Sequence, residues 1–244
     1  MCAYAVKGMD QGLNFLRDIM VSGYKPAVAR LHDPMEVQLQ HGGITPEGYA
    51  LVYLLCDGPK AVAEANGAGI SEIVKKYDHI VLGRKPVESW IIHRNDVAFN
   101  MDNDPFSAQG LVADTCEISA HWSAIGKIYE SACKRAAQEL PNLYFFGGHS
   151  SHSYISGTNI YFEFAFKVRS VETAEADYMK LISIIMEETL RLGGSIAHHH
   201  GSGKYRTAWM PQEHGSSYQL MYKLKDAMDP KGIMNKGVLL VDKD

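Results

Sequence analysis

Three consecutive histidines, His198, His199 and His200, are the residues of this 244-residue chain best suited to chemistry. They lie within residues 193–206, GGSIAHHHGSGKYR, where glycines precede and follow them. Glycine lets a backbone turn sharply and approach a flat or anionic group closely. Imidazoles titrate near neutral pH, so they can exchange a proton or bind a metal. The segment therefore indicates a functional loop, and a solvated histidine-rich loop is the alternative.

A second polar segment, residues 147–154, reads GGHSSHSY and contains His149 and His152. It is followed by residues 159–168, in which β-branched and aromatic residues alternate with charged ones, so this stretch is predicted to be a strand. Tyr161 lies on that strand. Its phenol could act as an acid or base, or its ring could simply pack in the core.

Arg30 lies on a shorter predicted strand, residues 27–31. The planar guanidinium fork suits bidentate binding of a phosphate or carboxylate. A surface ion pair is the alternative for this residue.

The composition indicates a soluble globular protein, with 46% hydrophobic and 21% charged residues. A net charge of -4 without a basic run argues against a nucleic-acid partner. No apolar run reaches the roughly 18 residues of a membrane span, and no signal peptide is recognisable, so we expect a cytoplasmic protein. The four cysteines are scattered, which argues against disulfides and structural zinc, and we expect Cys116 to be a packing residue.

The periodicity predicts an α+β fold with an antiparallel sheet flanked by helices, because strands and helices alternate without regular βαβ spacing. No internal repeat, dinucleotide-binding glycine motif, phosphate-binding loop or nucleophile elbow is visible. Strands are expected near 4–6, 27–31, 50–57, 79–82, 111–119, 144–146 and 159–168, and helices near 10–20, 33–40, 59–76, 86–93, 122–140, 173–192 and 217–228.

The triple-histidine segment, together with Asp229-Pro230 and Asn235-x-Gly237, resembles the C-terminal half of FAD-linked oxidases of the vanillyl-alcohol-oxidase type. Within that group the resemblance is closest to the alkyldihydroxyacetonephosphate synthase family. The weaker matches occur in the same order along nearly the whole chain: Pro26, Arg30-Leu31-x-Asp33, Glu117, Trp122, and the stretches 151–154 and 160–162.

The resemblance implies a two-part chain. Residues 1–170 would form a substrate-binding cap domain whose sheet covers the flavin ring, and residues 171–244 a C-terminal helical segment whose triple-histidine loop returns to the flavin site. FAD would be the cofactor. Because the sequence has no glycine-rich pyrophosphate loop, an FAD-binding domain would come from another chain or from the rest of a longer one.

The same resemblance implies exchange of an acyl chain for a long-chain alcohol, with FAD as a covalent electron sink and no net redox change. The substrate would be a small or lipid-like molecule, and the protein could form a homodimer. The implied roles are acid or base for Tyr161, active-site lining for His198, His199 and His200, cofactor contact for His200 and Asn235, and substrate binding for Arg30, His149 and His152.

Two positions depart from the family pattern. Residues 101–104 read MDND where an arginine is expected, and Lys236 replaces a proline. Two other interpretations stay open. One is a 2-hydroxy-acid dehydrogenase-like fragment with a metal on His149, His152 and His199, whereas the main interpretation assigns no metal. The other is a flavin-free interaction module.

Overall fold

The computed structural model describes residues 1–96 and 109–241, and the departure at 101–104 lies outside them. The strands are β1 (Cys2–Lys7), β2 (Val28–His32), β3 (Tyr49–Leu55), β4 (His79–Gly83), β5 (Leu111–His121), β6 (Leu143–Ser150) and β7 (Gly157–Lys167). The helices are α1 (Gly8–Val21), α2 (Pro34–Gln40), α3 (Lys60–Val74), α4 (Lys85–His93), α5 (Trp122–Glu139), α6 (Val171–Arg191), α7 (Met210–His214) and α8 (Tyr218–Met228), with short 3-10 turns at Thr207–Trp209 and Gly215–Ser217.

The strands form one antiparallel sheet in the order β4-β1-β3-β2-β6-β7-β5, which confirms the predicted fold class. Two halves share an arrangement, since β1-α1-β2-β3 and β5-α5-β6-β7 each place their third strand between the other two. The halves join where β2 pairs with β6. The sequence shows no repeat because strand and helix patterning can specify the same order with different residues.

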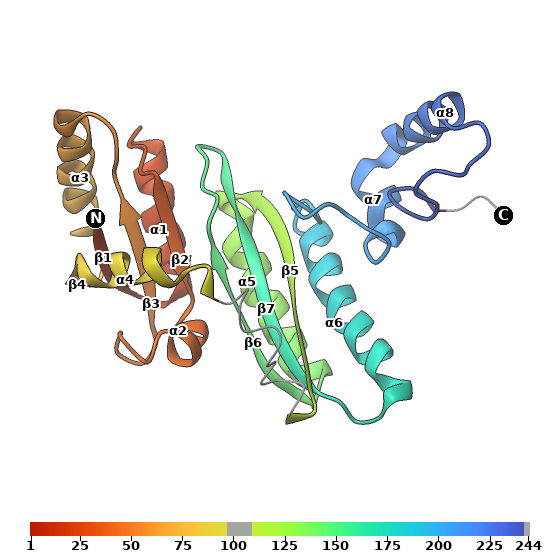
Figure 1. The fold of residues 1–244 in the computed structure, drawn as a ribbon, viewed down its shortest axis with the longest axis horizontal. Coiled ribbons are helices and arrows are strands. Elements are labelled where there is room, and N and C mark those ends of the chain that lie inside the picture. The colour runs from red at the N-terminus through yellow and green to blue at the C-terminus, as the bar shows by residue number, and fades with distance from the viewer. Residues whose placement is uncertain (97–108, 242–244) are drawn as a thin grey trace.

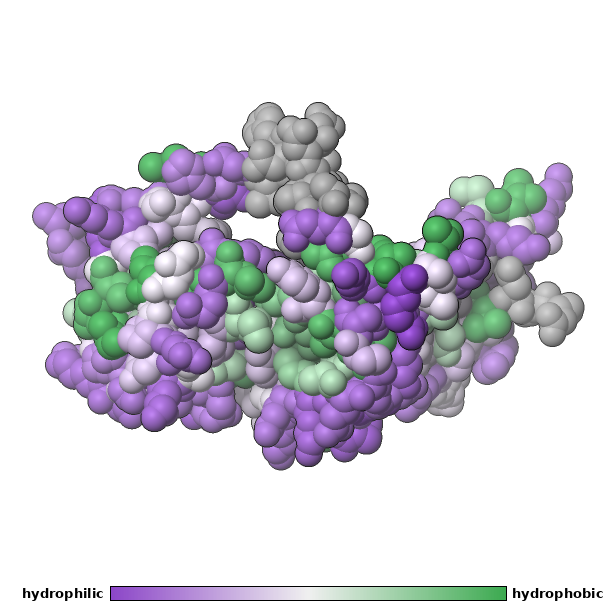
Figure 2. Space-filling model, turned by 90° about the horizontal axis from the view of Figure 1, so that it is seen from below, coloured by the Kyte–Doolittle hydropathy of each residue, from purple (hydrophilic) through white to green (hydrophobic). Residues whose placement is uncertain are grey.

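Helices α1, α3, α5 and α6 cover one face of the sheet (Figure 1). The main core lies between these helices and the strands, and includes Phe15, Phe162, Phe164 and Phe166, all at most 2% exposed. Cys116 belongs to this core, as predicted, and is fully buried. In a view from below, hydrophilic side chains follow the lower margin of the molecule and hydrophobic ones gather above them (Figure 2).

On the opposite face, α2 and α4 cover the end formed by β1 and β3 with a smaller apolar cluster around Tyr53. The remainder of this face, from β2 across to β5, carries polar side chains. This division follows from strand alternation, because successive residues point to opposite faces. On β5, Cys116 and Ile118 enter the main core, whereas Glu117 points to the polar face.

Helix α6 lies beyond the expected boundary at residue 170 but packs on α5 and β5, with Ile182 and Ile185 in the main core. After α6 the chain follows the edge of the sheet at β5 and then runs outward, and α8 lies at the far end of the molecule (Figure 1). Within the described residues, no helix is both long and apolar enough to cross a membrane.

Candidate functional site

A single transverse row of polar residues crosses four strands on the polar face. His32 of β2 is paired with His149 of β6, His149 with Tyr161 of β7, and Tyr161 with Glu117 of β5. Residues directly opposite each other in an antiparallel ladder project to the same face and touch. The register therefore gathers residues separated by more than a hundred positions into one line.

The β2 end of this row is the arginine cluster, made of Arg30, His32, Glu36 and His149. Arg30 Nε donates to His32 Nε2 at 3.0 Å, and Arg30 Nη2 lies 2.9 Å from His149 Nε2. The Nδ1 atoms of His32 and His149 lie 2.7 and 3.1 Å from Glu36 Oε1. Because a guanidinium only donates, both Nε2 atoms accept, and both Nδ1–H groups donate to the carboxylate.

Burial and neighbouring groups together set the charges in the arginine cluster. Glu36 is 1% exposed, and burial alone would raise the pKa of its carboxyl, but His32 and His149 lower it well below its usual range. Burial lowers the pKa of His32 to about 3, so its ring stays neutral. Glu36 is therefore an ionised carboxylate whose negative charge is linked to Arg30 through two imidazoles.

The arginine cluster is fixed by the start of α2. Asp33 caps this helix by accepting from the Glu36 N–H at 2.7 Å, and Pro34 suits the first helical position. The other Asp33 oxygen accepts from Gly148 N and from the Tyr129 hydroxyl, both at 2.6 Å. Burial raises the pKa of this carboxyl to about 6. These bonds join α2 to β6 and α5.

The triple-histidine segment crosses the edge of the sheet at β5. Ser195 and Ser119 exchange backbone hydrogen bonds, which adds one bridge to that edge. Arg206, 8% exposed, donates through Nη1 to the carbonyls of Glu117 and Ile196. Glu213 accepts from the Ile196 N–H at 2.9 Å. The histidines are thereby held over the polar face.

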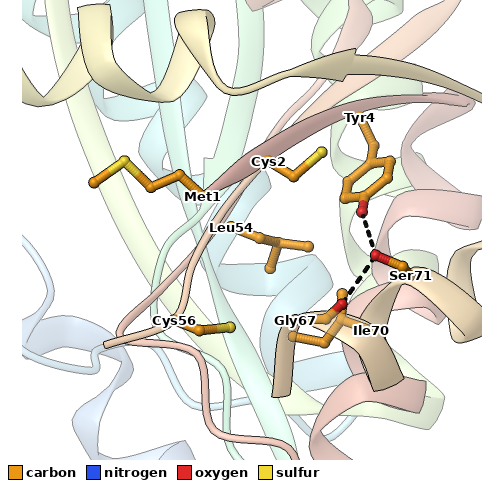
Figure 3. A pocket seen from close by; sticks show the side chains of 8 residues that line it. All are labelled: Met1, Cys2, Tyr4, Leu54, Cys56, Gly67, Ile70 and Ser71. Atoms are coloured by element: carbon orange, nitrogen blue, oxygen red, sulfur yellow. Dashed lines mark hydrogen bonds between the residues drawn. The ribbon is translucent and has the colours of Figure 1, made fainter. Parts of the chain in front are cut away.

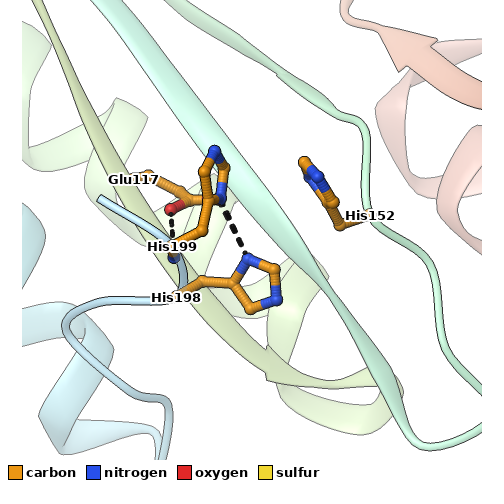
Figure 4. Close-up of side chains that lie close together, drawn as sticks. All are labelled: Glu117, His152, His198 and His199. Carbon is orange, nitrogen blue, oxygen red and sulfur yellow. Dashed lines mark hydrogen bonds and ion pairs between the residues drawn. The ribbon is translucent and has the colours of Figure 1, made fainter. Parts of the chain in front are cut away.

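The histidine cluster consists of Glu117, His152, His198 and His199 (Figure 4). Glu117 is fully buried; Oε1 accepts from Asn159 Nδ2 at 2.7 Å, and Oε2 accepts from the His199 backbone N–H at 3.0 Å. Burial alone would raise the pKa of Glu117, but these two donors lower it. A carboxylate is therefore present beneath the histidine rings.

Between the two clusters lies an open cavity of about 360 Å³. The residues lining it are Arg30, His149, Ser151, His152, Tyr161, Glu163, His199 and His200. This volume is within the usual range for small-molecule sites, which is roughly 300–1,000 Å³. The lining combines one guanidinium, four imidazoles and one carboxylate, so the cavity offers several hydrogen-bond donors to a polar ligand, with Arg30 as the permanent positive charge.

Tyr161 lies at the centre of the row. Its ring stacks on His149 with centroids 4.8 Å apart and meets the edge of His200 at 4.8 Å. The Thr115 hydroxyl donates to the Tyr161 oxygen at 3.0 Å. Because that oxygen accepts from Thr115, its own proton remains available for an acceptor in the cavity.

The structure gathers most residues singled out from the sequence. Arg30, His149, His152, Tyr161, His199 and His200 line one cavity, and His198 lies directly beside it. Asn235 does not line the cavity; it lies in the exposed tail after α8 with a φ of 46°. Of the three residues that the alternative interpretation groups as metal ligands, His149 belongs to the arginine cluster, whereas His152 and His199 belong to the histidine cluster.

Sequence analysis did not single out His32, Glu36, Glu163 or Asn159. The spacing of His32 and Glu36 was a usable signal, because they lie four residues apart across a predicted helix start marked by Asp33 and a proline. Glu163 and Asn159 give no such signal, since their roles depend on which strands become neighbours.

A second cavity, of about 180 Å³, lies at the other end of the sheet (Figure 3). Its lining is Met1, Cys2, Tyr4, Leu54, Cys56, Gly67, Ile70 and Ser71. Its one polar chain of contacts runs from Tyr4 to Ser71, 3.2 Å apart, and on to the Gly67 carbonyl. The lining is mostly apolar, and packing of β1 and β3 against α3 is sufficient to explain this cavity.

Comparison of the sequence with protein families gives a match to FAD linked oxidases, C-terminal domain, over residues 2–239. The chain is 39% identical over 250 residues to the Uncharacterized FAD-linked oxidoreductase YgcU of Escherichia coli O157:H7, covering 97% of this chain and 50% of that protein. It is 25% identical to the alkyldihydroxyacetonephosphate synthase of Dictyostelium discoideum, covering 92% and 41%. The chain spans about half the length of these relatives.

Among solved structures, an alkyldihydroxyacetonephosphate synthase matches with a TM-score of 0.70 at 20% identity, covering 96% of this chain and 43% of that one. The 4-ethylphenol oxidase from Gulosibacter chungangensis matches with a TM-score of 0.69 at 12% identity, covering 99% and 54%. At these identities the matches show a shared fold.

Proposed function

Since the chain belongs to the family of FAD-linked oxidase C-terminal domains, we propose that its polar face forms the substrate side of an FAD-dependent active site. The proposal rests on the row His32–His149–Tyr161–Glu117, which the triple-histidine segment covers at the β5 end. The reaction proposed is exchange of an acyl for an alkyl group, as the name of the alkyldihydroxyacetonephosphate synthase relatives suggests.

The cavity fits the ring part of a flavin, because it is lined by the flat side chains of Tyr161, His149, His199 and His200. The relatives are about twice as long as the part that this chain matches. We therefore place the main FAD-binding contacts in a further domain, in the same polypeptide or in another. When bound, FAD supplies an electron acceptor beside the substrate. His200 is the residue of this chain proposed to contact it.

Two groups of this chain handle the substrate in the proposal. Arg30 binds its phosphate or carboxylate, because the guanidinium is held in place by two imidazoles and lines the cavity. Tyr161 transfers a proton through its hydroxyl, which Thr115 orients. General acid or base catalysis of this kind contributes about 10²–10⁴-fold.

The test is Tyr161→Phe in the flavin-loaded protein, assembled with its FAD-binding portion. Exchange between an acyl-dihydroxyacetone phosphate and a long-chain alcohol should fall by at least about 100-fold. Tyr144→Phe is the matched control, because Tyr144 is 61% exposed on β6. Equal rates in the two variants would remove Tyr161 from the proposed mechanism.

Two results would favour the other interpretations. Anaerobic bleaching of the flavin by a 2-hydroxy acid, without acyl exchange, would indicate a dehydrogenase. Failure to acquire the visible flavin spectrum with any FAD-binding portion would indicate a flavin-free interaction module. Both are read by absorbance on the same preparation.

A further inference from the structure

In the histidine cluster, one carboxylate oxygen and two ring nitrogens lie against one another. His199 Nδ1 is 2.6 Å from Glu117 Oε1, His198 Nδ1 is 3.3 Å from it, and the two Nδ1 atoms are 3.1 Å apart. A carboxylate oxygen only accepts hydrogen bonds, and a ring nitrogen either donates or accepts. These three contacts form a triangle with Glu117 at one corner.

While Glu117 is an ionised carboxylate, no arrangement of protons on the two rings satisfies this triangle. If both Nδ1 atoms are protonated, each donates to Glu117, but the two N–H groups face each other at 3.1 Å. If only one is protonated, the lone pair of the other faces the carboxylate. If neither is, all three contacts join lone pairs. A cation at the centre would make all three favourable.

We propose that Glu117, His198 and His199 bind a divalent transition-metal ion, with Zn²⁺ the best suited to this mixture of nitrogen and oxygen ligands. Bonds of about 2.0–2.2 Å place the ligands of a tetrahedral ion about 3.3–3.6 Å apart. The separations of 3.1 and 3.3 Å nearly match this. His199 would move away from Glu117 by less than about 1 Å.

The surrounding hydrogen bonds prepare these groups as ligands. His198 Nε2 lies 3.0 Å from the Tyr154 hydroxyl, so an Nε2–H that donates there leaves Nδ1 unprotonated for a metal. Asn159 and the His199 backbone N–H fix both oxygens of Glu117. Partners of this kind orient the ligands in known metal sites.

The charge balance also favours a cation. Glu117 is fully buried, and in the part of the chain that the structure describes its carboxylate pairs only with histidines. Arg206 donates to the Glu117 carbonyl and not to the side chain. In the arginine cluster, by contrast, Arg30 supplies the positive charge. A buried carboxylate without a cation is costly, and a metal would remove that cost.

The site would open toward the cavity. The ligand atoms of Glu117, His152, His198 and His199 all lie within 4.8 Å of one another, and His152 and His199 line the cavity. His152 would be a fourth ligand or leave that position to a substrate oxygen. Three protein ligands with one open position are typical of catalytic zinc sites.

The test needs neither flavin nor turnover, so its outcome is independent of the proposed function. The purified full chain, stripped with a chelator, is titrated with Co²⁺ while visible ligand-field absorption is recorded, and with Zn²⁺ in a calorimeter. We expect one ion per chain. Glu117→Gln and His198→Asn should each weaken binding by more than about 100-fold, the upper limit for loss of a mere supporting group.

His121→Asn is the matched control, because His121 is exposed at the end of β5, where its Nδ1 lies 3.1 Å from the Ser156 carbonyl oxygen. It should bind the ion as the unchanged chain does. Circular dichroism checks the fold of each variant, and if Glu117→Gln unfolds, His198→Asn decides. Absence of one-to-one binding, or equal affinity in His198→Asn and the control, would overturn the proposal.

Discussion

Replacement of Glu36 by glutamine tests the arginine cluster most directly. Both imidazole Nδ1–H groups donate to the same oxygen, Oε1, while Oε2 has no hydrogen-bond partner among the described residues. An amide oxygen can therefore keep both contacts. Glutamine nevertheless removes the negative charge that balances Arg30 and puts an NH₂ group without an acceptor at the buried position of Oε2.

The expected loss follows from burial. Glu36 and His32 are 1% and 2% exposed, so solvent does not compensate for the lost negative charge. Removing one partner of a buried charged pair costs about 3–5 kcal/mol. For a chain of this size, each kcal/mol corresponds to roughly 2–4 °C in melting temperature. Glu36→Gln should therefore lower the melting temperature by about 6–20 °C.

The assay is urea and thermal unfolding followed by circular dichroism. Glu187→Gln is the matched control, since Glu187 is 51% exposed and pairs with Arg135 at 3.0 Å. A surface pair contributes at most about 1 kcal/mol. If the two variants lost the same free energy of unfolding, the buried hydrogen-bond chain from Glu36 through the two imidazoles to Arg30 would not be a stabilising element.

Two further predictions concern stability. Because the pKa of His32 is lowered to about 3, chiefly by burial, below pH 6.5 the unfolded chain takes up a proton that the folded chain does not. The stability contributed by neutral His32 is complete above pH 6.5 and falls by about 1.4 kcal/mol per pH unit below it. The free-energy difference from His32→Asn in urea titrations at pH 7.5 and 5.5 should shrink accordingly, and a constant difference would contradict the assignment. In α3, Gly67→Ala should stabilise the chain by about 0.5–1 kcal/mol, because no atom lies within 4 Å of the added methyl. The Gly69→Ala variant should be less stable than Gly67→Ala by at least about 1 kcal/mol, because its methyl would lie 2.0 Å from Tyr24. Equal melting temperatures of the two variants would refute that contact.

Local pattern was enough for most of the fold. The alternation in residues 159–168 and the apolar run at 50–57 predicted strands that the structure contains as β7 and β3. The helix predicted near 59–76 is present as α3, which runs through Asn66-Gly67-Ala68-Gly69 without a break. The two glycines lower the helix propensity of this segment, but Gly69 leaves room for the Tyr24 ring. The strand order could not be predicted in this way, because it depends on contacts between residues far apart.

The sequence by itself determined the family, since the triple-histidine segment is specific and the comparisons confirm the resemblance. It also determined which residue types are available for chemistry, including Tyr161 and Arg30. The residues of a motif and of its turns lie close together in the chain, so the local sequence is enough to specify them.

Only the tertiary structure decided which of these residues meet. The pairing of β2 with β6 brings His32 to His149, and the bridge from Ser195 to Ser119 sets the triple-histidine segment over Glu117. It also placed His149 in a different cluster from His152 and His199, with which the alternative dehydrogenase-like interpretation grouped it as metal ligands. The physical reason is register: a shift of one residue in either pairing would turn these side chains to the other face of the sheet.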